Sequence, residues 1–122
     1  MNYVIHTRNQ IRYLECLAEN QPISCERDAL DWLALCGENE VDQMLIHENN
    51  LTDDFFNLRT GVAGDILQRF AIYHVRLAAV INPSKANAGR FGEMVLEANR
   101  GSQFRVFQDQ ESAEDWLFSP KK

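Results

Sequence analysis

The sequence has few cysteines and none of the long apolar runs that cross membranes. Its three cysteines, Cys16, Cys25 and Cys36, are odd in number and include no C-x-x-C pair. Each lies in an apolar segment, where a free thiol packs as a small hydrophobic group. The longest apolar run, LAAVI at 77–81, is too short to span a bilayer, and residues 1–10 lack the features of a secretion signal. We therefore expect free thiols, a reducing cytoplasm and no membrane partner.

Basic charge is scarce. Lys and Arg number 12 against 18 Asp and Glu, so the net charge is −6, and a chain of this charge repels a polyanion. Lys85, Arg90, Arg100 and Arg105 fall in one part of the chain, and one basic face can exist on an acidic protein. We interpret these four residues as a solvated surface and expect no nucleic-acid partner.

Metal-site spacings and catalytic motifs are also missing. His6, His47 and His74 are scattered, and none lies at ligand spacing from a cysteine. There is no G-x-S-x-G segment, and Cys25, the thiol nearest a predicted helix start, is better explained as a packed side chain. The sequence therefore predicts no metal, no cofactor and no catalytic residues, which favours a protein without enzymatic activity.

Short runs of strand-forming residues alternate with helical segments along the 122 residues, a length typical of one domain. The predicted strands are 3–7, 11–17, 41–47, 75–82 and 103–109. The predicted helices are 25–36, one from 52, one from about 60, 90–100 and 110–118. This order, β-β-α-β-α-β-α-β-α over residues 1–122, predicts a single α/β domain with a mainly parallel sheet and an antiparallel N-terminal edge hairpin.

Residues typical of helix ends support these boundaries. Ser24, Thr52 and Asp109 fit N-cap positions, where a side-chain oxygen accepts a backbone N–H. Gly37 and Gly101 lie just past the predicted ends of two helices. For Thr52, an N-cap role predicts that Thr52→Ala costs about 0.5–2 kcal/mol.

Gly61 and Gly64 interrupt the helical pattern, although a helical glycine costs about 1 kcal/mol relative to alanine. They do not form a phosphate-binding P-loop, because Asp65 and Ile66 replace the lysine and hydroxyl that follow its second glycine. We interpret the glycines as a break between a short and a longer helix, or as a site of close backbone packing. Approach of a ligand is the open alternative.

The stretch FFNLRTGVAGDILQRF at 55–70, followed by Tyr73, RLAAVI at 76–81 and EANRG at 97–101, resembles an uncharacterised bacterial family, domain of unknown function number 4180. The likeness extends over nearly the whole chain. Ile72 departs from the pattern, since the family usually has an asparagine there.

In element order the chain also resembles the STAS domain, which anti-sigma-factor antagonists share with the cytoplasmic tails of sulfate transporters. The antagonists accept a phosphate on a serine or threonine at the start of the helix that follows the middle strand. Thr52 occupies the analogous place, within HENNLTD, where those proteins have a D-S-x-G-type loop. The STAS-like arrangement therefore implies a regulatory role, with Thr52 as a candidate phosphorylation site.

Ligands of an open parallel sheet bind near the carboxyl ends of its strands. Two such places here are HENN at 47–50 and NPSK at 82–85, which makes His47, Glu48 and Asn82 candidate binding residues. His47 and Glu48 could in principle form a base and its orienting carboxylate. Adjacent strand residues face opposite sides, however, and an ordinary surface loop is the alternative interpretation.

Arg59, Thr60 and Arg100 complete the candidate binding residues, because each lies beside a glycine-bearing turn. Guanidinium groups bind carboxylates and phosphates through two hydrogen bonds. If Arg59 and Arg100 converge on one cleft, they would suit an anionic ligand or an acidic partner loop. Otherwise Arg100 binds the last carbonyls of its own helix and Arg59 pairs with a nearby aspartate.

We expect a non-enzymatic regulatory or protein-interaction module of the bacterial cytoplasm, with a protein partner. The alternative is a small-molecule anion-binding protein or enzyme with its site at the carboxyl ends of the strands near Arg59. That alternative requires a pocket with convergent polar groups rather than a flat surface. A homodimer is compatible with either function.

Overall fold

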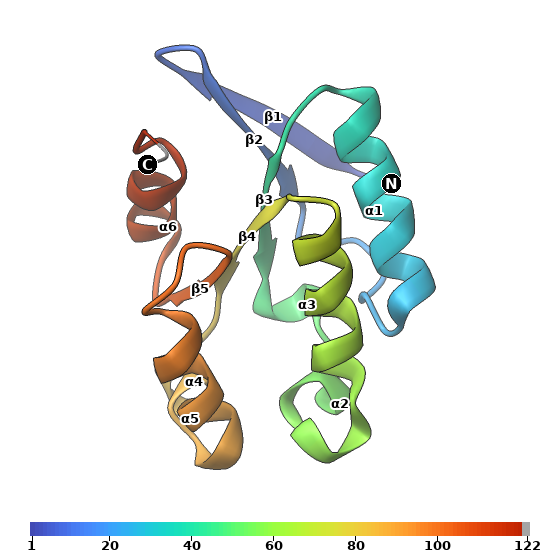
Figure 1. Ribbon diagram of the computed structural model, residues 1–122, viewed down its shortest axis with the longest axis vertical. Coiled ribbons are helices and arrows are strands. Elements are labelled where there is room, and N and C mark those ends of the chain that lie inside the picture. The colour runs from blue at the N-terminus through green and yellow to red at the C-terminus, as the bar shows by residue number, and fades with distance from the viewer. Residues whose placement is uncertain (121–122) are drawn as a thin grey trace.

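The computed structural model describes residues 1–120, which fold around one five-stranded sheet (Figure 1). The strands are β1 (Tyr3–Arg8), β2 (Ile11–Cys16), β3 (Gln43–His47), β4 (Arg76–Val80) and β5 (Phe104–Phe107). The α-helices are α1 (Glu26–Glu38), α2 (Asp53–Phe56), α3 (Val62–Ile72), α4 (Pro83–Ala86), α5 (Gly89–Ala98) and α6 (Gln110–Leu117). Two 3-10 helices, η1 (Glu48–Asn50) and η2 (Leu58–Thr60), follow β3 and α2. The predicted α/β class is confirmed.

The strands lie across the sheet in sequence order, β1-β2-β3-β4-β5. β1 pairs with β2 in antiparallel orientation, whereas β2 to β5 are parallel. The hairpin between β1 and β2 turns at Asn9 and Gln10, whose φ values of 52° and 69° fit the left-handed conformation of a tight hairpin turn. The predicted antiparallel edge on a mainly parallel sheet is therefore confirmed.

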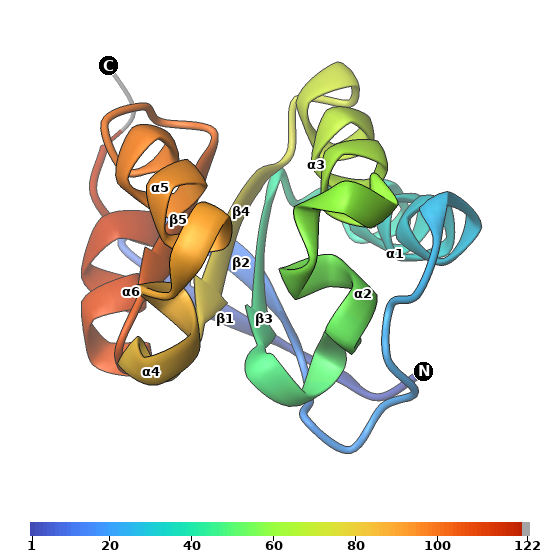
Figure 2. The same cartoon turned by 90° about the horizontal axis from the view of Figure 1, so that it is seen from below.

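The main hydrophobic core lies on one face of this sheet. Side chains alternate along a strand, so every second residue faces the same side. Leu14, Met44, Leu77 and Phe104 form this face and pack in one buried cluster with residues of α1, α2, α3 and α5. Figure 2 shows α1, α2 and α3 on one side of β3 and α6 on the other.

The opposite face is covered by α6, a helix of eight residues. Its Leu117 packs in a smaller cluster with Tyr13 and Leu45. Polar contacts fix the helix as well: the Tyr13 hydroxyl donates to the Glu114 carboxylate at 2.7 Å, and Gln43 Nε2 donates to the Leu117 carbonyl at 2.8 Å. Because so short a helix spans only part of a five-stranded face, the strands carry several polar side chains on this side.

The start of α1 differs from the prediction. Cys25 is the N-cap residue, with no side-chain capping bond, and the predicted N-cap Ser24 lies one residue earlier. Ser24 donates its backbone N–H and its hydroxyl to the Asp28 carboxylate, each at 2.9 Å, and these bonds contribute to a lowered pKa of Asp28. The Asp28 carboxylate, in the first turn of α1, thus accepts hydrogen bonds from Ser24, the residue before the N-cap, as in half of a capping box.

The C-cap positions predicted for two helices from Gly37 and Gly101 differ in the structure. Gly37 lies inside α1, whose C-cap is Asn39, and Gly101 follows two residues after Asn99, the C-cap of α5. Neither glycine has a positive φ, so neither forms the left-handed cap that favours glycine. Asp109 does cap α6, as predicted, by accepting a backbone N–H at 2.8 Å.

The three cysteines are free thiols. Cys16 and Cys36 are buried, and burial raises the pKa of each thiol to about 12. Cys25 is exposed at the start of α1, so the prediction that all three pack in the interior is wrong for this residue. Its position on the first turn of an amphipathic helix, outside the apolar stripe, explains the difference.

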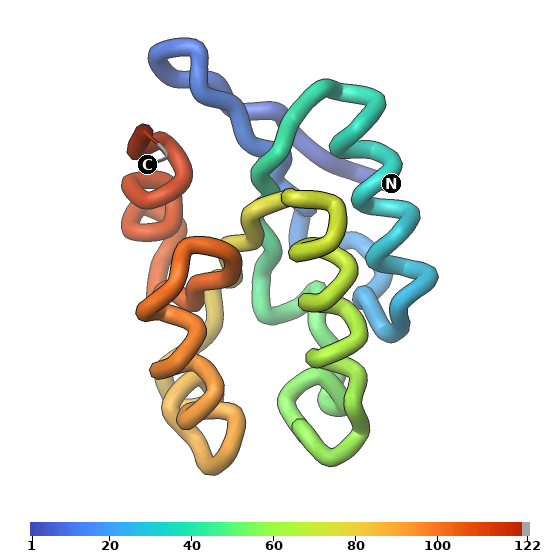
Figure 3. Tube along the Cα trace, viewed as in Figure 1, coloured from blue at the N-terminus to red at the C-terminus, as the bar shows by residue number. Residues whose placement is uncertain are grey.

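The predicted break between two helices is confirmed. The tube in Figure 3 shows the chain changing direction between α2 and α3, where η2 and Gly61 lie. Gly61 has φ of 78°, a left-handed conformation that other residues rarely adopt. Gly64 lies inside α3, and a Cβ added to either glycine would meet no atom within 4 Å. The alternative of close backbone packing is therefore wrong.

We predict opposite effects of alanine at these two glycines. Gly64→Ala should stabilise the protein by about 0.5–1 kcal/mol, because it is a solvent-exposed helical position with room for a methyl group. Gly61→Ala should destabilise it by about 1 kcal/mol or more, because of its positive φ. Urea denaturation measures both, and a destabilising Gly64→Ala would contradict the prediction.

Candidate functional site

A surface cavity of about 370 Å³ lies between η2 and the start of α5. Arg59 and Arg90 line it, together with Phe56 and Phe91. The segments that form it follow the carboxyl ends of β3 and β4, and Figure 1 shows α2, α4 and the start of α5 at one end of the molecule. The cavity therefore lies where ligands of open parallel sheets bind.

Aromatic packing holds the two walls of this cavity together. The ring centroids of Phe56 and Phe91 are 5.0 Å apart, and those of Phe55 and Phe91 are 5.9 Å apart, both edge-to-face. Phe55 is completely buried and so anchors this cluster in the core. Lys85 Nζ lies 4.9 Å from the centroid of the Phe56 ring. The segments that carry Arg59 and Arg90 are thus fixed relative to each other.

Arg59 and Arg90 give the cavity positive charge. Both are exposed, and neither forms an ion pair within 4 Å in the part of the chain that the structure describes. The interpretation that Arg59 pairs with a nearby aspartate is therefore wrong. Lys85 adds a third cation, which Glu48 balances in part at 3.6 Å.

Thr60 builds the turn that presents Arg59. Its Oγ1 lies 2.7 Å from the Asp54 carbonyl and 2.9 Å from the Asn57 carbonyl, and it accepts the Val62 N–H at 3.2 Å. One hydroxyl proton is shared between the two carbonyls, so its hydrogen-bonding capacity is used within the turn. In this structure Thr60 positions Arg59, and contact of Thr60 with a ligand stays a prediction.

Arg100 lies outside the cavity. Its side chain is 79% exposed and its Nη1 is 3.6 Å from the Glu97 carboxylate, so it forms an ion pair rather than binding the last carbonyls of α5. The ten residues of α5 rise about 15 Å and separate Arg100 from Arg90. Convergence of Arg59 and Arg100 on one cleft is therefore wrong, and Arg90 takes the second place.

Glu48, which follows β3, and Asn82, which follows β4, connect the segments behind the cavity. The Glu48 carboxylate accepts the backbone N–H of Asn82 at 2.8 Å, and Asn82 Oδ1 accepts the Ser84 N–H at 2.9 Å as the N-cap of α4. His47 does not contact Glu48 in this network. It lies on the opposite side, as the alternation of strand residues predicts, so the two do not form a base with its orienting carboxylate.

His47 instead belongs to a cluster on the face of the sheet that α6 covers. The Nε2 atoms of His47 and His6 are each 2.8 Å from a different oxygen of the Glu15 carboxylate, and Gln110 Nε2 donates to the same carboxylate at 3.1 Å. Glu15 is 9% exposed. Because an ionised carboxylate only accepts hydrogen bonds, both imidazoles carry a proton on Nε2. The cluster thus joins β1, β2, β3 and α6.

The protonation state of Glu15 follows from these contacts. Burial acts to raise its pKa, but hydrogen bonds from His47, His6 and Gln110 outweigh burial and lower the pKa below its ordinary value of 4.5. The carboxylate is therefore ionised at neutral pH and both its oxygens are occupied. Such a group connects parts of the fold and has no vacant oxygen for a ligand.

One sequence signal could have identified this cluster. Glu15 lies in β2, IRYLEC, between Leu14 and Cys16, which a strand of this kind buries. A buried carboxylate needs hydrogen-bonding partners, because an unpaired charge in the interior is very unfavourable. The choice of His6 and His47 as partners depends on strand order, which the sequence alone did not give.

Thr52 occupies the N-cap position of α2, as predicted, but its hydroxyl makes no capping bond. Its Oγ1 is buried and has no hydrogen-bond partner among residues 1–120. The capping energy expected from the sequence is therefore not supported by the geometry. Phosphorylation of Thr52 stays a prediction, and it would require this oxygen to become accessible.

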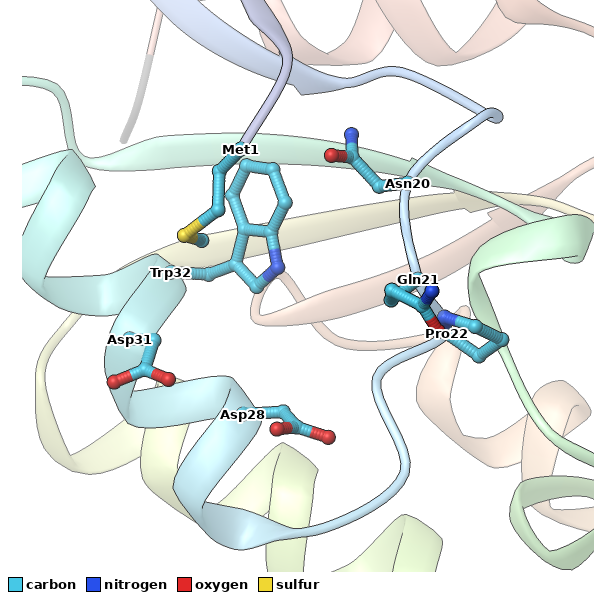
Figure 4. A pocket seen from close by; sticks show the side chains of 7 residues that line it. All are labelled: Met1, Asn20, Gln21, Pro22, Asp28, Asp31 and Trp32. Carbon is cyan, nitrogen blue, oxygen red and sulfur yellow. The ribbon is translucent and has the colours of Figure 1, made fainter.

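An acidic surface cavity of about 230 Å³ lies beside α1. Figure 4 shows Asp28, Asp31 and Trp32 on this helix, across from the loop that carries Gln21 and Pro22. Its carboxylates would repel an anionic group, so the Arg59–Arg90 cavity is the candidate anion site of the two.

Metal-binding clusters and membrane-spanning helices are both absent from residues 1–120. No group of three or more His, Cys, Asp or Glu side chains in this range could hold a metal ion. No helix in the same range has both the length and the apolar character needed to cross a bilayer.

The fold and the cavity define an α/β protein with a basic, loop-built surface site at the carboxyl ends of its parallel strands. The family model described as Domain of unknown function (DUF4180) matches residues 8–117, and the chain belongs to this family. No curated protein and no solved structure matches the chain. The family predicted from the motifs at 55–70 and 97–101 is thus confirmed.

We predict that Glu15→Gln destabilises the protein in a pH-dependent way. The folded-state pKa of Glu15 is lowered, so its ionised form stabilises the fold above about pH 4.5 and loses this effect as the pH falls through the folded-state pKa. Loss of the charge-assisted bonds should cost about 1–3 kcal/mol at pH 7. The difference from wild type should shrink below about pH 4.

Chemical denaturation at several pH values measures this effect. Glu19→Gln is the matched control, because Glu19 is exposed, and it should change the unfolding free energy by less than about 0.5 kcal/mol. If Glu15→Gln were as stable as wild type at pH 7, a stabilising role of the Glu15 cluster in joining the strands and α6 would be refuted.

We predict that Thr52→Val does not destabilise the protein. The change removes a buried, unpartnered hydroxyl and keeps the shape of the side chain, so the unfolding free energy should stay equal or rise by up to about 1 kcal/mol. Thermal and urea denaturation test this. A loss of about 1 kcal/mol or more would show that Thr52 does cap α2 in solution.

Proposed function

We propose that this protein is a non-enzymatic interaction module that binds an acidic segment of a protein partner. One observation carries the proposal: Arg59 and Arg90, two guanidinium groups without ion-pair partners in the described chain, line the same cavity. Guanidinium groups bind carboxylates through paired hydrogen bonds. Arginine beside aromatic side chains is also the composition typical of interface hot spots.

The open form of the cavity favours a protein segment over a small molecule. Arg59 and Arg90 are exposed, Phe56 and Leu58 are partly exposed, and Phe91 is buried below them. Pockets for small ligands usually enclose most of the ligand surface. An open basic cavity with an apolar base instead suits an acidic and an apolar side chain that a larger partner presents. A small anion at this site is the alternative.

Charge selects the partner. The chain carries a net charge of −6, so its surface as a whole repels acidic proteins. Arg59 and Arg90 give the cavity a local positive charge that opposes this repulsion. Affinity for an acidic segment should therefore fall as salt concentration rises.

The regulatory part of the proposal rests on the STAS-like element order. Thr52 precedes α2, and Phe56 at the end of that helix lines the cavity. A phosphate on Thr52 would add negative charge near Arg59 and compete with an acidic partner. A bacterial cytoplasm is the proposed setting, because the protein has three free thiols.

Titration of the ¹⁵N-labelled protein with a synthetic peptide of glutamate and phenylalanine residues tests the proposal. Shifts should concentrate at residues 56–60 and 88–91, and a peptide with lysine in place of glutamate should not bind. Arg59→Glu and Arg90→Glu should each weaken binding about tenfold or more, which corresponds to about 1.4 kcal/mol. Arg100→Glu is the matched control and should leave the affinity within about twofold of wild type.

Equal affinity of wild type and Arg59→Glu would refute the proposal. Native mass spectrometry with gentle desalting separates it from the alternative. A small anion that co-purifies with wild type but not with Arg90→Glu would favour the small-molecule site. The same spectra count the subunits and so test for a homodimer.

A further inference from the structure

A second basic cavity lies on the face of the sheet that α6 covers. It has a volume of about 440 Å³ and is lined by Arg76, Arg105, Trp116, Ser102 and Ser119, among others. Arg76 is the first residue of β4, so this cavity lies towards the amino ends of the strands. The Arg59–Arg90 cavity lies beyond their carboxyl ends, and the two sites share no lining residue.

Trp116 holds the two arginines side by side. Their Cζ atoms lie 4.1 Å (Arg76) and 5.1 Å (Arg105) from the centroid of a Trp116 ring. Arg76 and Arg105 come from the adjacent strands β4 and β5, and Trp116 comes from α6. Because cation–π contacts orient guanidinium groups over an aromatic ring, both side chains are preorganised.

Most of the hydrogen-bond donors of these arginines have no acceptor among the described residues 1–120. Arg76 Nη2 donates to the Trp116 carbonyl at 3.3 Å, and Arg105 Nε donates to the Gly101 carbonyl at 2.7 Å. Arg76 Nε is buried and has no hydrogen-bond partner within residues 1–120. Neither guanidinium forms an ion pair within 4 Å in that range.

The two charges also act on each other. Burial lowers the pKa of Arg76 and the charge of Arg105 lowers it further, while Asp42 acts in the opposite direction. An arginine nevertheless stays protonated in proteins, so two cations face one cavity. A bound anion would offset their repulsion and accept the unused N–H groups.

We propose that this cavity binds a small organic anion, whose carboxylate or phosphate group lies between Arg76 and Arg105. The volume of about 440 Å³ falls in the range of small-molecule sites. The Ser102 hydroxyl on its wall can donate a further hydrogen bond to such a group, whereas the Ser119 hydroxyl already donates to the Asp115 carbonyl at 2.6 Å. This site is separate from the proposed partner site and does not depend on it.

Titration of the ¹⁵N-labelled full chain at low ionic strength tests this inference, with inorganic phosphate and citrate as separate probes. At least one probe should give saturable shifts at the Trp116 indole N–H and at residues 102–105. A response to phosphate alone assigns the site to phosphates, and a response to citrate alone assigns it to carboxylates. A response to both shows that the site accepts both classes of anion. Sodium chloride at equal ionic strength should not reproduce the shifts.

Arg105→Gln should weaken binding of the active probe about tenfold or more. Arg27→Gln is the matched control, because Arg27 is exposed and lines neither cavity, and its affinity should equal that of wild type. Arg76→Lys keeps the charge but removes the planar group, and it should also weaken binding without unfolding the protein. Thermal denaturation confirms that each variant is folded.

Three results would overturn the proposal. The first is the absence of saturable shifts with both probes, and the second is unchanged affinity in folded Arg105→Gln. The third is a response confined to residues 56–60 and 88–91, which would place anion binding in the Arg59–Arg90 cavity alone.

Discussion

The unequal cover of one five-stranded sheet determines where this protein has polar clusters. One face packs against α1, α2, α3 and α5 and is apolar, whereas α6 with its eight residues covers the other. Several strand residues that α6 does not cover are polar, and where they are buried they must pair with one another or with the ends of that helix. The Glu15 cluster at the start of α6 and the Arg76–Trp116–Arg105 cluster near its end both follow from this constraint.

The parallel strands place a different kind of site at their carboxyl ends. The chain leaves β3 and β4 into short helices and turns, and these bring Arg59 and Arg90 to one cavity. Gly61 makes the turn after Arg59, Thr60 closes it with hydrogen bonds, and Phe56 and Phe91 join its two walls. The site thus consists of exposed charges on a well-packed support.

Most of the fold and part of the candidate sites could be predicted from the sequence. Period-two and helical patterns predicted the element order, since these patterns reflect burial along each element. Arg59, a predicted binding residue, lines a cavity with Arg90 instead of Arg100, because the direction of α5 brings its start and not its end to the loop after β3. The sequence allows His47 and Glu48 to form a base and its orienting carboxylate, whereas in the structure His47 is hydrogen-bonded to Glu15, 32 residues earlier in the chain.

Local sequence by itself determined the α/β class, the antiparallel first hairpin, the helix break at Gly61 and the cap at Asp109. Each depends on interactions within a few residues, so composition and spacing specify it. Tertiary structure alone decided the Glu15 cluster, the Arg59–Arg90 cavity and the second basic cavity around Trp116. These join side chains from strands and helices far apart in the chain, and only the order of strands and the packing of helices bring such residues within hydrogen-bonding or cation–π distance.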